Sequence, residues 1–271
     1  MPTLLRQRLR ALYPDTSGRS LKQWLTSGRV SVNGVVVRRG DAAVGEADHV
    51  TLGRPAIEFP APLRLVYADE HILVVDKPPG LLTIATESQR ERTVYRLLRD
   101  WSEARDEGRI FVVHRLDRET SGLLVFARTA MVKRRLQAQF EARSVERIYI
   151  ARVQGLVRED EGVLTSRLAE SRTLRVRPVR DPRQGREAIT RYRVLARIGD
   201  ATLLELSLVT GRRGQIRAQL ADFGHPIVGD REYGARRDRT GRVFLHATRL
   251  GFVHPTGRRV VFESPPPPGL R

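Results

Sequence analysis

The sequence predicts an α+β protein whose main domain is a mixed, largely antiparallel sheet flanked by helices, preceded by a small N-terminal α/β module. Short apolar or alternating runs, which are typical of strands, recur from Leu63 onwards. These runs do not alternate with helices in the regular βαβ rhythm that indicates a parallel sheet. A proline-rich stretch over residues 54–62 precedes them, and its stiffness favours a short connector between two folded parts.

Residues 1–53 are predicted to form the N-terminal module, which begins with two helices. Helical spacing relates four leucines near the start, namely Leu4, Leu5, Leu9 and Leu12. Ser20 followed by Gln23 matches a capping box, so a second helix is expected over residues 21–27, with Gly28 at its end.

The rest of the module is expected to be a small sheet. Valines alternate around Asn33 and Gly34 within residues 30–37, which predicts a hairpin with a type I′ turn, and a further strand is expected over residues 49–52. Basic residues spread over the module, and three of them are candidate RNA contacts: Arg19, Lys22 and Arg29. Charges alone do not separate a surface that follows an RNA backbone from a solvated helix face, so both interpretations stay open.

The main domain is predicted over residues 63–265, with an extended, peripheral proline-rich tail over residues 266–271. Strands are expected where short apolar or alternating runs are bounded by turn residues. These runs cover residues 72–76, 111–113, 123–127, 147–153, 186–198, 201–208, 243–250 and 259–263, with one more near Leu174.

Helices of the main domain are predicted from capping signals and spacing. Thr93 is the expected N-cap of a helix ending near Glu103, and a second helix is expected over residues 129–141. A glycine-bracketed turn precedes a short helix over residues 215–222, which Gly224 ends.

The charge balance is the strongest global signal for a partner. The 271 residues carry 49 Lys and Arg against 31 Asp and Glu, a net charge of +18, and Lys occurs only as Lys22, Lys77 and Lys133. Arginine spread along the whole chain suits a surface that follows a phosphate backbone, so a polyanionic partner is favoured over an organism-wide preference for Arg. The sequence contains no basic amphipathic helix with aromatic anchors, so a membrane partner is less favoured than a nucleic acid.

The composition also excludes several classes of chemistry. The chain has no Cys, which excludes disulfides, thiolate nucleophiles and Cys-based metal sites, and fits a reducing cytoplasm. No glycine-rich nucleotide-binding motif occurs, and the six His show no paired ligand spacing, so neither a cofactor nor a metal is expected. No run approaches ~18 apolar residues and no signal-peptide pattern follows Met1, so a soluble cytoplasmic protein is expected.

The stretch from His114 to Gly122 is the strongest candidate site. It places one carboxylate, Asp117, between Arg115 and Arg118. Apolar runs on both sides indicate buried strands, so Asp117 is expected on a tight connection where a rigid scaffold can present a reactive side chain. The alternative is an ordinary turn-forming Asp in a solvated ion pair.

Two further stretches could cooperate with Asp117. Tyr149 is expected on a strand, and the turn over residues 210–214 could deliver Arg217 into a pocket. Each has a simpler explanation: Tyr149 as a core aromatic with its hydroxyl at the rim, and Arg217 as a surface residue of its helix. His114 is likewise more often a packed, hydrogen-bonded histidine than a base.

Residues 114–127 resemble the signature of the RluA-type pseudouridine synthases. Five further stretches resemble the same family in the same order, namely residues 74–80, 147–155, 210–220, 224–234 and 245–255. The resemblance covers about residues 63–265 and implies the pseudouridine synthase fold. The N-terminal module resembles the small RNA-binding domain named after ribosomal small-subunit protein four, which several members of the family carry.

The resemblance implies an enzyme that works on RNA without a cofactor or a metal. Such enzymes detach a uridine base at its N-glycosidic bond, rotate it and rejoin it through carbon. Asp117 matches the family's catalytic carboxylate, which attacks either the base or the sugar and must be ionised to do so. Arg217 matches the arginine that pairs with this carboxylate, and Tyr149 matches the aromatic residue that stacks on the target base.

The resemblance also implies base flipping, because a stacked uridine must leave its stack before it can react. Arg115 matches the arginine that fills the vacated space, and Leu245 is a candidate for the apolar wall of the pocket. The remaining candidate RNA contacts in these motifs are His114, Arg118, Arg212 and Gln215.

Four positions depart from the pattern of the family. Arg213 and Gly214 stand where Thr and His are usual, Gln219 stands where a second His is usual, and Arg147 stands where Lys is common. These changes leave Asp117, Tyr149 and Arg217 untouched. They are therefore expected to alter RNA contacts and substrate choice more than the reaction itself.

The resulting hypothesis is a pseudouridine synthase that acts as a monomer on ribosomal RNA, with the large subunit favoured. Ribosomal RNA is favoured over tRNA because family members with this N-terminal module mostly modify ribosomal RNA. The alternative is a non-catalytic RNA-binding or ribosome-assembly protein that retains the fold. A DNA-binding protein is a third option, which no helix-turn-helix or basic zipper pattern supports.

Overall fold

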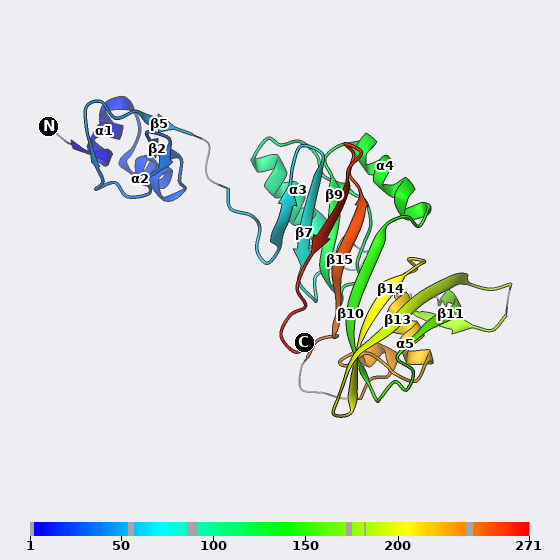
Figure 1. The fold of residues 1–271 in the computed structure, drawn as a ribbon. Coiled ribbons are helices and arrows are strands. Elements are labelled where there is room, and N and C mark those ends of the chain that lie inside the picture. The colour runs from blue at the N-terminus through cyan, green and yellow to red at the C-terminus, as the bar shows by residue number, and fades with distance from the viewer. Residues whose placement is uncertain are drawn as a thin grey trace. The chain divides into compact units, whose positions relative to one another are not determined.

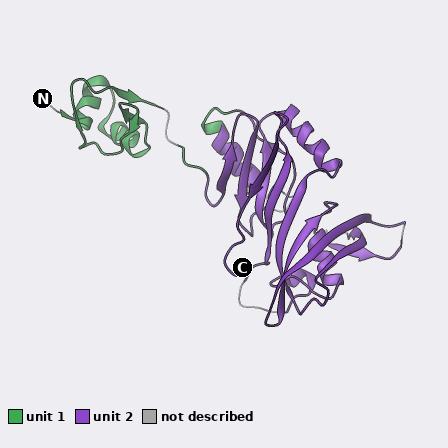
Figure 2. Ribbon diagram, in the orientation of Figure 1, with its two compact units in different colours: residues 1–59, 103–107 green, residues 60–102, 108–271 purple. Residues whose placement is uncertain are grey.

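The computed structural model of the chain describes residues 3–53, 57–85, 92–171, 175–181, 183–236 and 241–270. The chain divides into two compact units (Figure 2): Met1–Phe59 with Glu103–Glu107, and Pro60–Ser102 with Gly108–Arg271. The boundary after Phe59 falls inside the proline-rich stretch that the sequence marks as a connector, residues 54–62.

The N-terminal unit packs two helices against short strands. Helices α1 (Leu5–Leu12) and α2 (Gly18–Thr26) bury four leucines in a common core with Val30 and Val44. The three-stranded sheet has the order β3-β2-β5, and β1 pairs with β4. The bounds of these strands are β1 (Thr3–Leu4), β2 (Val30–Val32), β3 (Val35–Val36), β4 (Ala43–Val44) and β5 (Val50–Leu52).

The start of α2 differs from the prediction, whereas the hairpin turn is confirmed. Ser17, not Ser20, is the N-cap, because its Oγ accepts a hydrogen bond from the Ser20 amide at 3.1 Å and its own backbone is extended. The helix therefore begins at Gly18. In the hairpin, Asn33 and Gly34 have φ angles of 50° and 81°, the two positive values that a type I′ turn requires.

Within the described residues, the large unit is built on one 11-stranded sheet (Figure 1). Its hydrogen-bonded order is β12-β11-β13-β14-β10-β15-β9-β7-β6, with β16 on β15 and β8 on β9. The strands are β6 (Arg64–Ala68), β7 (Ile72–Lys77), β8 (Phe111–Val112), β9 (Ser121–Ala127), β10 (Glu146–Gln154), β11 (Glu161–Glu170), β12 (Val176–Val179), β13 (Arg186–Ile198), β14 (Ala201–Leu208), β15 (Leu245–Val253) and β16 (Arg259–Glu263).

One pairing between the described strands of this sheet is parallel. β15 runs parallel to β9, with His246 opposite Ser121 and Ala247 opposite Gly122, while the other strand pairs are antiparallel. A Cβ at Gly122, whose φ is 113°, would lie 2.3 Å from the Ala247 carbonyl oxygen, so only glycine fits here. The predicted mixed, largely antiparallel sheet is confirmed.

The helices of the large unit follow the predicted signals. They are α3 (Val94–Ala104), α4 (Ala130–Glu141) and α5 (Gln215–Asp222), with a short 3-10 turn, η1 (Arg231–Tyr233). Thr93 and Thr129 cap α3 and α4, since their Oγ1 atoms accept from the amides three residues later at 3.2 Å. Helix α4 contacts β9 and β15, and α5 contacts β11 and β12.

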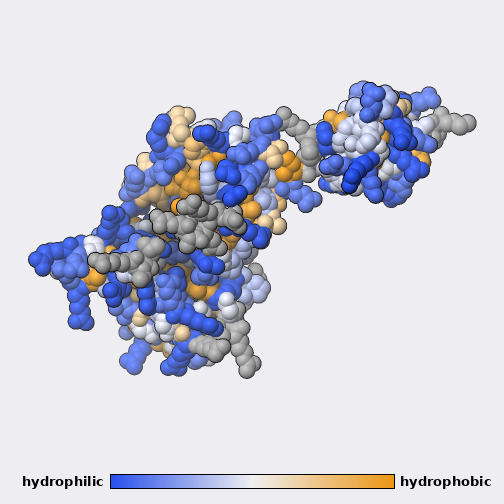
Figure 3. Space-filling model, turned by 180° about the vertical axis from the view of Figure 1, so that it is seen from behind, coloured by the Kyte–Doolittle hydropathy of each residue, from blue (hydrophilic) through white to orange (hydrophobic). Residues whose placement is uncertain are grey.

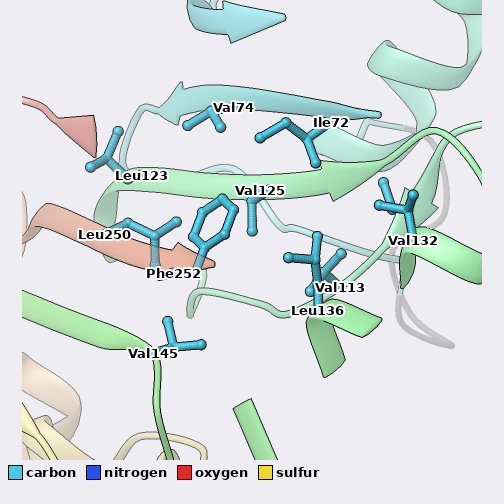
Figure 4. Packing of buried hydrophobic residues seen from close by; sticks show 11 residues of the cluster. Ile72, Val74, Val113, Leu123, Val125, Val132, Leu136, Val145, Leu250 and Phe252 are labelled. Atoms are coloured by element: carbon cyan, nitrogen blue, oxygen red, sulfur yellow. The ribbon is translucent and has the colours of Figure 1, made fainter. Parts of the chain in front are cut away.

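A hydrophobic core of the large unit lies where α4 meets the sheet (Figure 4). Strands β7 and β9 contribute Ile72 and Val125, α4 contributes Leu136, and β15 contributes Phe252, all of them at most 1% exposed. Because the apolar residues of β9 are buried on both faces, this strand is a rigid base for the loop that precedes it.

Most strand predictions agree with the structure. Strands β13, β14 and β16 have the predicted bounds, whereas β15 begins at Leu245 rather than at residue 243. The strand expected near Leu174 falls on a position outside the described residues, and β12 follows it.

The surface seen in Figure 3 is largely hydrophilic, with smaller hydrophobic areas between the charged side chains. In the described part of the chain, no helix is both long enough and apolar enough to cross a membrane. Nor do the described residues include three or more His, Asp or Glu side chains grouped so that they could hold a metal ion.

Candidate active site

A pocket of about 520 Å³ opens in the large unit. Three segments bring the predicted catalytic side chains into its lining: the β8–β9 connection with Asp117, strand β10 with Tyr149, and helix α5 with Arg217. The predicted RNA contacts Arg115, Leu245, His114, Arg212 and Gln215 line it as well. A cavity of this size is in the range of ordinary small-ligand sites.

The backbone around Asp117 is fixed by hydrogen bonds on its N-terminal side. Thr83 Oγ1 donates to the Leu116 carbonyl at 2.9 Å and accepts from the Leu116 amide at 3.2 Å. The Thr120 amide donates to the Asp117 carbonyl at 3.2 Å, which closes the turn. Thr83 is 2% exposed, so this contact is shielded from water. Sequence reasoning missed Thr83, because nothing in its own neighbourhood marks it.

Lys77 fixes the C-terminal side of the same loop. Its fully buried ammonium donates to the carbonyls of Pro78, Leu81 and Arg118 at 2.9, 2.8 and 3.0 Å, and the Gly80 amide donates to the Arg118 carbonyl at 2.9 Å. Burial lowers the pKa of Lys77 to about 7. The sequence did contain a signal for this residue, since Lys77 is a rare Lys beside a sharp turn in an arginine-rich chain.

The surroundings of Asp117 act on its charge in opposite directions. Burial raises the pKa of Asp117, because it disfavours the ionised carboxylate. The positive charges of Arg217, Arg115 and Arg213 lower the pKa in turn, as does the backbone of Gly214 at the start of α5. The net pKa is raised, so Asp117 ionises less readily than an exposed aspartate.

Arg217 does not make the hydrogen-bonded pair with Asp117 that the resemblance implies. Its Nε and Nη2 donate to the Asp230 carboxylate at 2.6 and 2.7 Å, and Nη2 also donates to Glu232 at 2.8 Å. The Asp230 side chain is 1% exposed and takes this fork because a buried carboxylate needs a partner. Burial lowers the pKa of Arg217, but the hydrogen bonds and charges of Asp230 and Glu232 have the larger effect, so the pKa is raised overall. Arg217 acts on Asp117 through its charge alone.

Tyr149 lies on β10 with 8% of its surface exposed. Burial raises the pKa of Tyr149 to about 12, and the negative charge of Asp117 adds to this effect. The phenol is therefore neutral at physiological pH. A neutral phenol can stack on a base and can donate a hydrogen bond. Because it carries no negative charge, it does not form an ion pair with the arginines that act on Asp117.

His114 supports the fold at the pocket wall. Its Nε2 accepts a hydrogen bond from the Val125 amide at 3.1 Å, and its ring stacks on Phe140 with 4.6 Å between ring centroids. Burial lowers the pKa of His114 to about 3, and the nearby charge of Arg147 acts in the same direction. The ring is neutral at physiological pH, and its contact with RNA stays a prediction.

Gln215 shapes the turn that precedes α5. Its Oε1 accepts from Thr210 Oγ1 at 2.8 Å and from the Arg212 amide at 3.0 Å, while its Nε2 donates to the Ile189 carbonyl at 3.0 Å and to Thr190 Oγ1 at 2.9 Å. The amide group is thus fully occupied by the protein. A direct contact of Gln215 with RNA stays a prediction, as does that of Arg212.

The other predicted RNA contacts lie elsewhere. Arg118 is exposed but does not line the pocket, because its Nε donates to the Gly80 carbonyl at 3.2 Å. The three candidates of the N-terminal unit, Arg19, Lys22 and Arg29, belong to the other compact unit.

The two unusual residues before Gln215 have structural explanations. A Cβ at Gly214, whose φ is 58°, would lie 2.9 Å from Tyr233 Oη, so the tyrosine ring occupies the space that a side chain would need. Arg213 forms an ion pair with Glu170 on β11. The ring of Tyr233 lies against Arg217, with the guanidinium carbon 4.7 Å from the ring centroid.

Gln219, the third departure, faces the sheet rather than the pocket. Its Nε2 donates to the carbonyls of Leu164 and Ala188, both at 3.0 Å, and to Ser166 Oγ at 3.1 Å, while its Oε1 accepts from Thr190 Oγ1 at 2.6 Å. Gln219 therefore ties α5 to strands β11 and β13. Its effect on the pocket is indirect, through the position of the helix that carries Arg217.

Comparisons with known proteins agree with this geometry. The family model described as RNA pseudouridylate synthase matches residues 71–222. An uncharacterized RNA pseudouridine synthase of Aquifex aeolicus (strain VF5) is 36% identical, over 94% of this chain and 87% of the relative. Ribosomal large subunit pseudouridine synthase D of Pseudomonas aeruginosa is also 36% identical, over 94% of this chain and 86% of the relative.

A solved structure shares the fold. Human RNA Pseudouridylate Synthase Domain Containing 4 superposes with a TM-score of 0.65 at 22% identity, over 76% of this chain and 90% of that chain. The predicted fold class is confirmed by this likeness. The family match and the relatives at 33–36% identity assign the family: the chain belongs to the RNA pseudouridylate synthase family, in its RluA-type branch.

Proposed function

We propose that this pseudouridine synthase isomerises specific uridines of large-subunit ribosomal RNA. In the reaction, the bond between ribose C1′ and base N1 breaks, the base rotates, and C1′ forms a new bond to base C5. The proton on C5 then leaves to solvent, and N1, which has lost its bond to ribose, takes up a proton in its place. No oxidant, reductant or metal is needed for this balance, and each step requires only that the base be held and that charge be stabilised.

The observation that carries this proposal is a half-buried carboxylate, Asp117, and a buried neutral phenol, Tyr149, that share one arginine-lined pocket. Asp117 is held by backbone contacts on both sides, so its position is set before RNA arrives. We assign it the role of nucleophile: its carboxylate forms a transient bond to the sugar or the base, and that bond breaks again as the product forms, which regenerates the carboxylate. The charges of Arg217, Arg115 and Arg213 favour its ionised form. Tyr149 is assigned to stacking on the target base.

Arg115 suits the role of the residue that replaces the flipped base. It is exposed at the pocket, and no described group lies within hydrogen-bond or ion-pair distance of its guanidinium. A planar cation without a protein partner can enter the stack that a uridine has left. Leu245, which is 2% exposed, supplies an apolar wall.

Large-subunit ribosomal RNA is the proposed target because several relatives carry it in their names. Two relatives are named ribosomal large subunit pseudouridine synthase D: that of Pseudomonas aeruginosa is 36% identical to this chain, and that of Vibrio cholerae is 33% identical. The test uses transcripts labelled with tritium at uracil C5, since isomerisation releases that label to water. We expect release from a large-subunit ribosomal RNA transcript and none from a pool of tRNA transcripts. Release from neither would leave a protein that only binds RNA.

We further propose that the N-terminal unit is an RNA-binding domain of the type found in ribosomal small-subunit protein four. Its two helices and its hairpin sheet support this assignment. The side chains of Arg19 and Lys22 lie exposed on α2, and neither has a described hydrogen-bond partner, so both can contact phosphates. Arg29 is partly occupied, because its Nε donates to the Gly53 carbonyl at 3.0 Å.

Deletion of residues 1–53 should weaken RNA binding and flatten its dependence on salt. The physical reason is that each lost phosphate contact removes about 0.7 to 0.9 from the slope of log K against log salt. Filter binding of the large-subunit transcript at four salt concentrations measures the slope. The matched control is the full chain with Arg10→Gln, a single exposed change outside the three candidates, which should alter the slope by about one contact at most. An unaltered slope in the deletion variant would mean that these charges face only solvent.

A further inference from the structure

Arg147 is a buried cation at the wall of the pocket. It lies two residues before Tyr149 on β10, so both side chains point to the same face of the sheet. It is 8% exposed. Its Nη2 donates to the carbonyls of Leu208 and Val209, both at 3.3 Å, whereas its Nε is buried without a hydrogen-bond partner.

No carboxylate balances this charge. Among the described residues, none lies within ion-pair distance of Arg147, although Arg213 and Arg217 in the same lining have Glu170 and Asp230. Burial lowers the pKa of Arg147, and the charge of Arg143 acts in the same direction. A guanidinium nevertheless stays protonated in proteins, and among the described residues this charge meets two carbonyls and the ring of Phe140, 5.7 Å from the guanidinium carbon, but no anion.

Arg143 stands at the rim of the same pocket. It follows α4 with a φ of 57°, is exposed, and has no described carboxylate within ion-pair distance. The two arginines therefore present one buried and one exposed cation on the Tyr149 side of the pocket. Two positive charges close together repel each other and destabilise the fold, and an anion bound between them offsets this repulsion.

We propose that Arg147 and Arg143 form a subsite for a backbone phosphate of the RNA strand next to the flipped uridine. The inference rests on the proposed function, because a nucleotide whose base stacks on Tyr149 brings its flanking phosphates to the wall of the same pocket, which Arg147 and Arg143 also line. Arginine suits the ligand, since its planar fork can donate two hydrogen bonds to one phosphate. The phosphate supplies the counter-charge that the protein does not.

A purely structural role would be to brace the turn after β14. The bonds to Leu208 and Val209 fit that role, and a Cβ at Gly211 would lie 2.4 Å from Arg147 Nη1, so the turn and the guanidinium are closely packed. A brace needs neither an anion nor an exposed second arginine. The two roles differ in a measurable way, because only a phosphate contact contributes to the salt dependence of RNA recognition.

The experiment measures tritium release from the large-subunit transcript by the full chain, and fits kcat and KM at several salt concentrations. Arg147→Met should raise KM on the order of ten-fold, leave kcat within about three-fold, and flatten the slope of log(kcat/KM) against log salt by about 0.7. Arg147→Lys, which keeps the charge, should restore the slope and most of KM. Arg152→Met is the matched control, since Arg152 lies on the same strand but outside the pocket lining, and it should leave KM and slope unchanged.

Two outcomes would overturn the subsite. One is an active Arg147→Met variant with unchanged KM and salt slope; the other is a loss of kcat alone that Arg147→Lys does not restore, which is the result expected for a brace. Should Arg147→Met fail to fold, Arg143→Met replaces it, because the side chain of Arg143 is exposed. It should also raise KM and flatten the slope, and an unchanged slope there rejects the proposal. Absence of release by the unaltered protein would reject the proposed function itself and is recognised separately.

Discussion

Replacing Asp117 by Asn should reduce the rate of tritium release from 5-tritiated uridine in RNA by about 10³-fold or more. Loss of a nucleophile has an effect of this size in other enzymes. Asparagine has nearly the same shape but cannot supply the ionised oxygen that attacks carbon. RNA binding should survive, because Thr83 and Lys77 hold the loop through its backbone and not through the carboxylate. The variant also makes the pocket more positive, which does not oppose binding of a polyanion.

The control for this variant is Glu141→Gln, at the end of α4 and in the lining of the same pocket. Glu141 is exposed, and among the described residues no cation lies within ion-pair distance of its carboxylate. The control removes one negative charge, as Asp117→Asn does, and should keep the rate of tritium release within about two-fold of that of the unaltered protein. Both variants are assayed for single-turnover release and for filter binding of the same transcript. Turnover by Asp117→Asn at a rate close to that of the unaltered protein would remove Asp117 from the chemistry.

Replacing Arg217 by Met should cost about 3–5 kcal/mol of the free energy of unfolding and also abolish turnover. The stability loss arises because the Asp230 side chain, 1% exposed, would be left as a buried charge without its two hydrogen bonds from Arg217. The loss of turnover arises because Arg217 is the strongest positive charge acting on Asp117. Urea-induced unfolding and tritium release measure the two effects separately.

Two further variants separate stability from chemistry. The double variant Arg217→Met with Asp230→Asn removes the stranded charge, so part of the stability should return while turnover stays lost. Glu232→Gln is the control for the exposed side of the fork: its carboxylate is 49% exposed, so the change should cost less than about 1 kcal/mol. If the double variant regained turnover, Arg217 would be a structural partner of Asp230 and nothing more.

The parts of the fold that the sequence predicted well are those with strong local patterns. Strands β13 and β14 have long alternating runs and a glycine turn between them, and α5 is bracketed by Gly214 and Gly224, so their bounds followed from local rules. Strand β11 was not predicted, because its apolar and polar residues alternate weakly around Gly162 and much of it is exposed. The start of α2 was misplaced because Ser17 and Ser20 carry the same capping chemistry and only the backbone angles distinguish them.

The candidate site was predictable as a set of residues but not as a set of contacts. Asp117, Tyr149 and Arg217 could be named because their motifs resemble a known family, and the structure places all three in one pocket lining. That Arg217 bonds Asp230, and that Lys77 holds the Asp117 loop, depends on how distant segments meet. Such pairings follow from three-dimensional packing, which local patterns along a chain do not contain.

The parallel pairing of β9 with β15 also has a consequence for how the enzyme is made. It joins Ser121 to His246, which are 125 residues apart, and the loop that carries Asp117 leads directly into β9. Contacts of such large sequence separation slow folding, because the loop between them must close before they form. During synthesis, residue 246 must leave the ribosome before this pairing can form, so the pocket is completed only when nearly the whole chain has been translated. A nascent chain that stops short of β15 would therefore carry Asp117, Tyr149 and Arg217 without an assembled site.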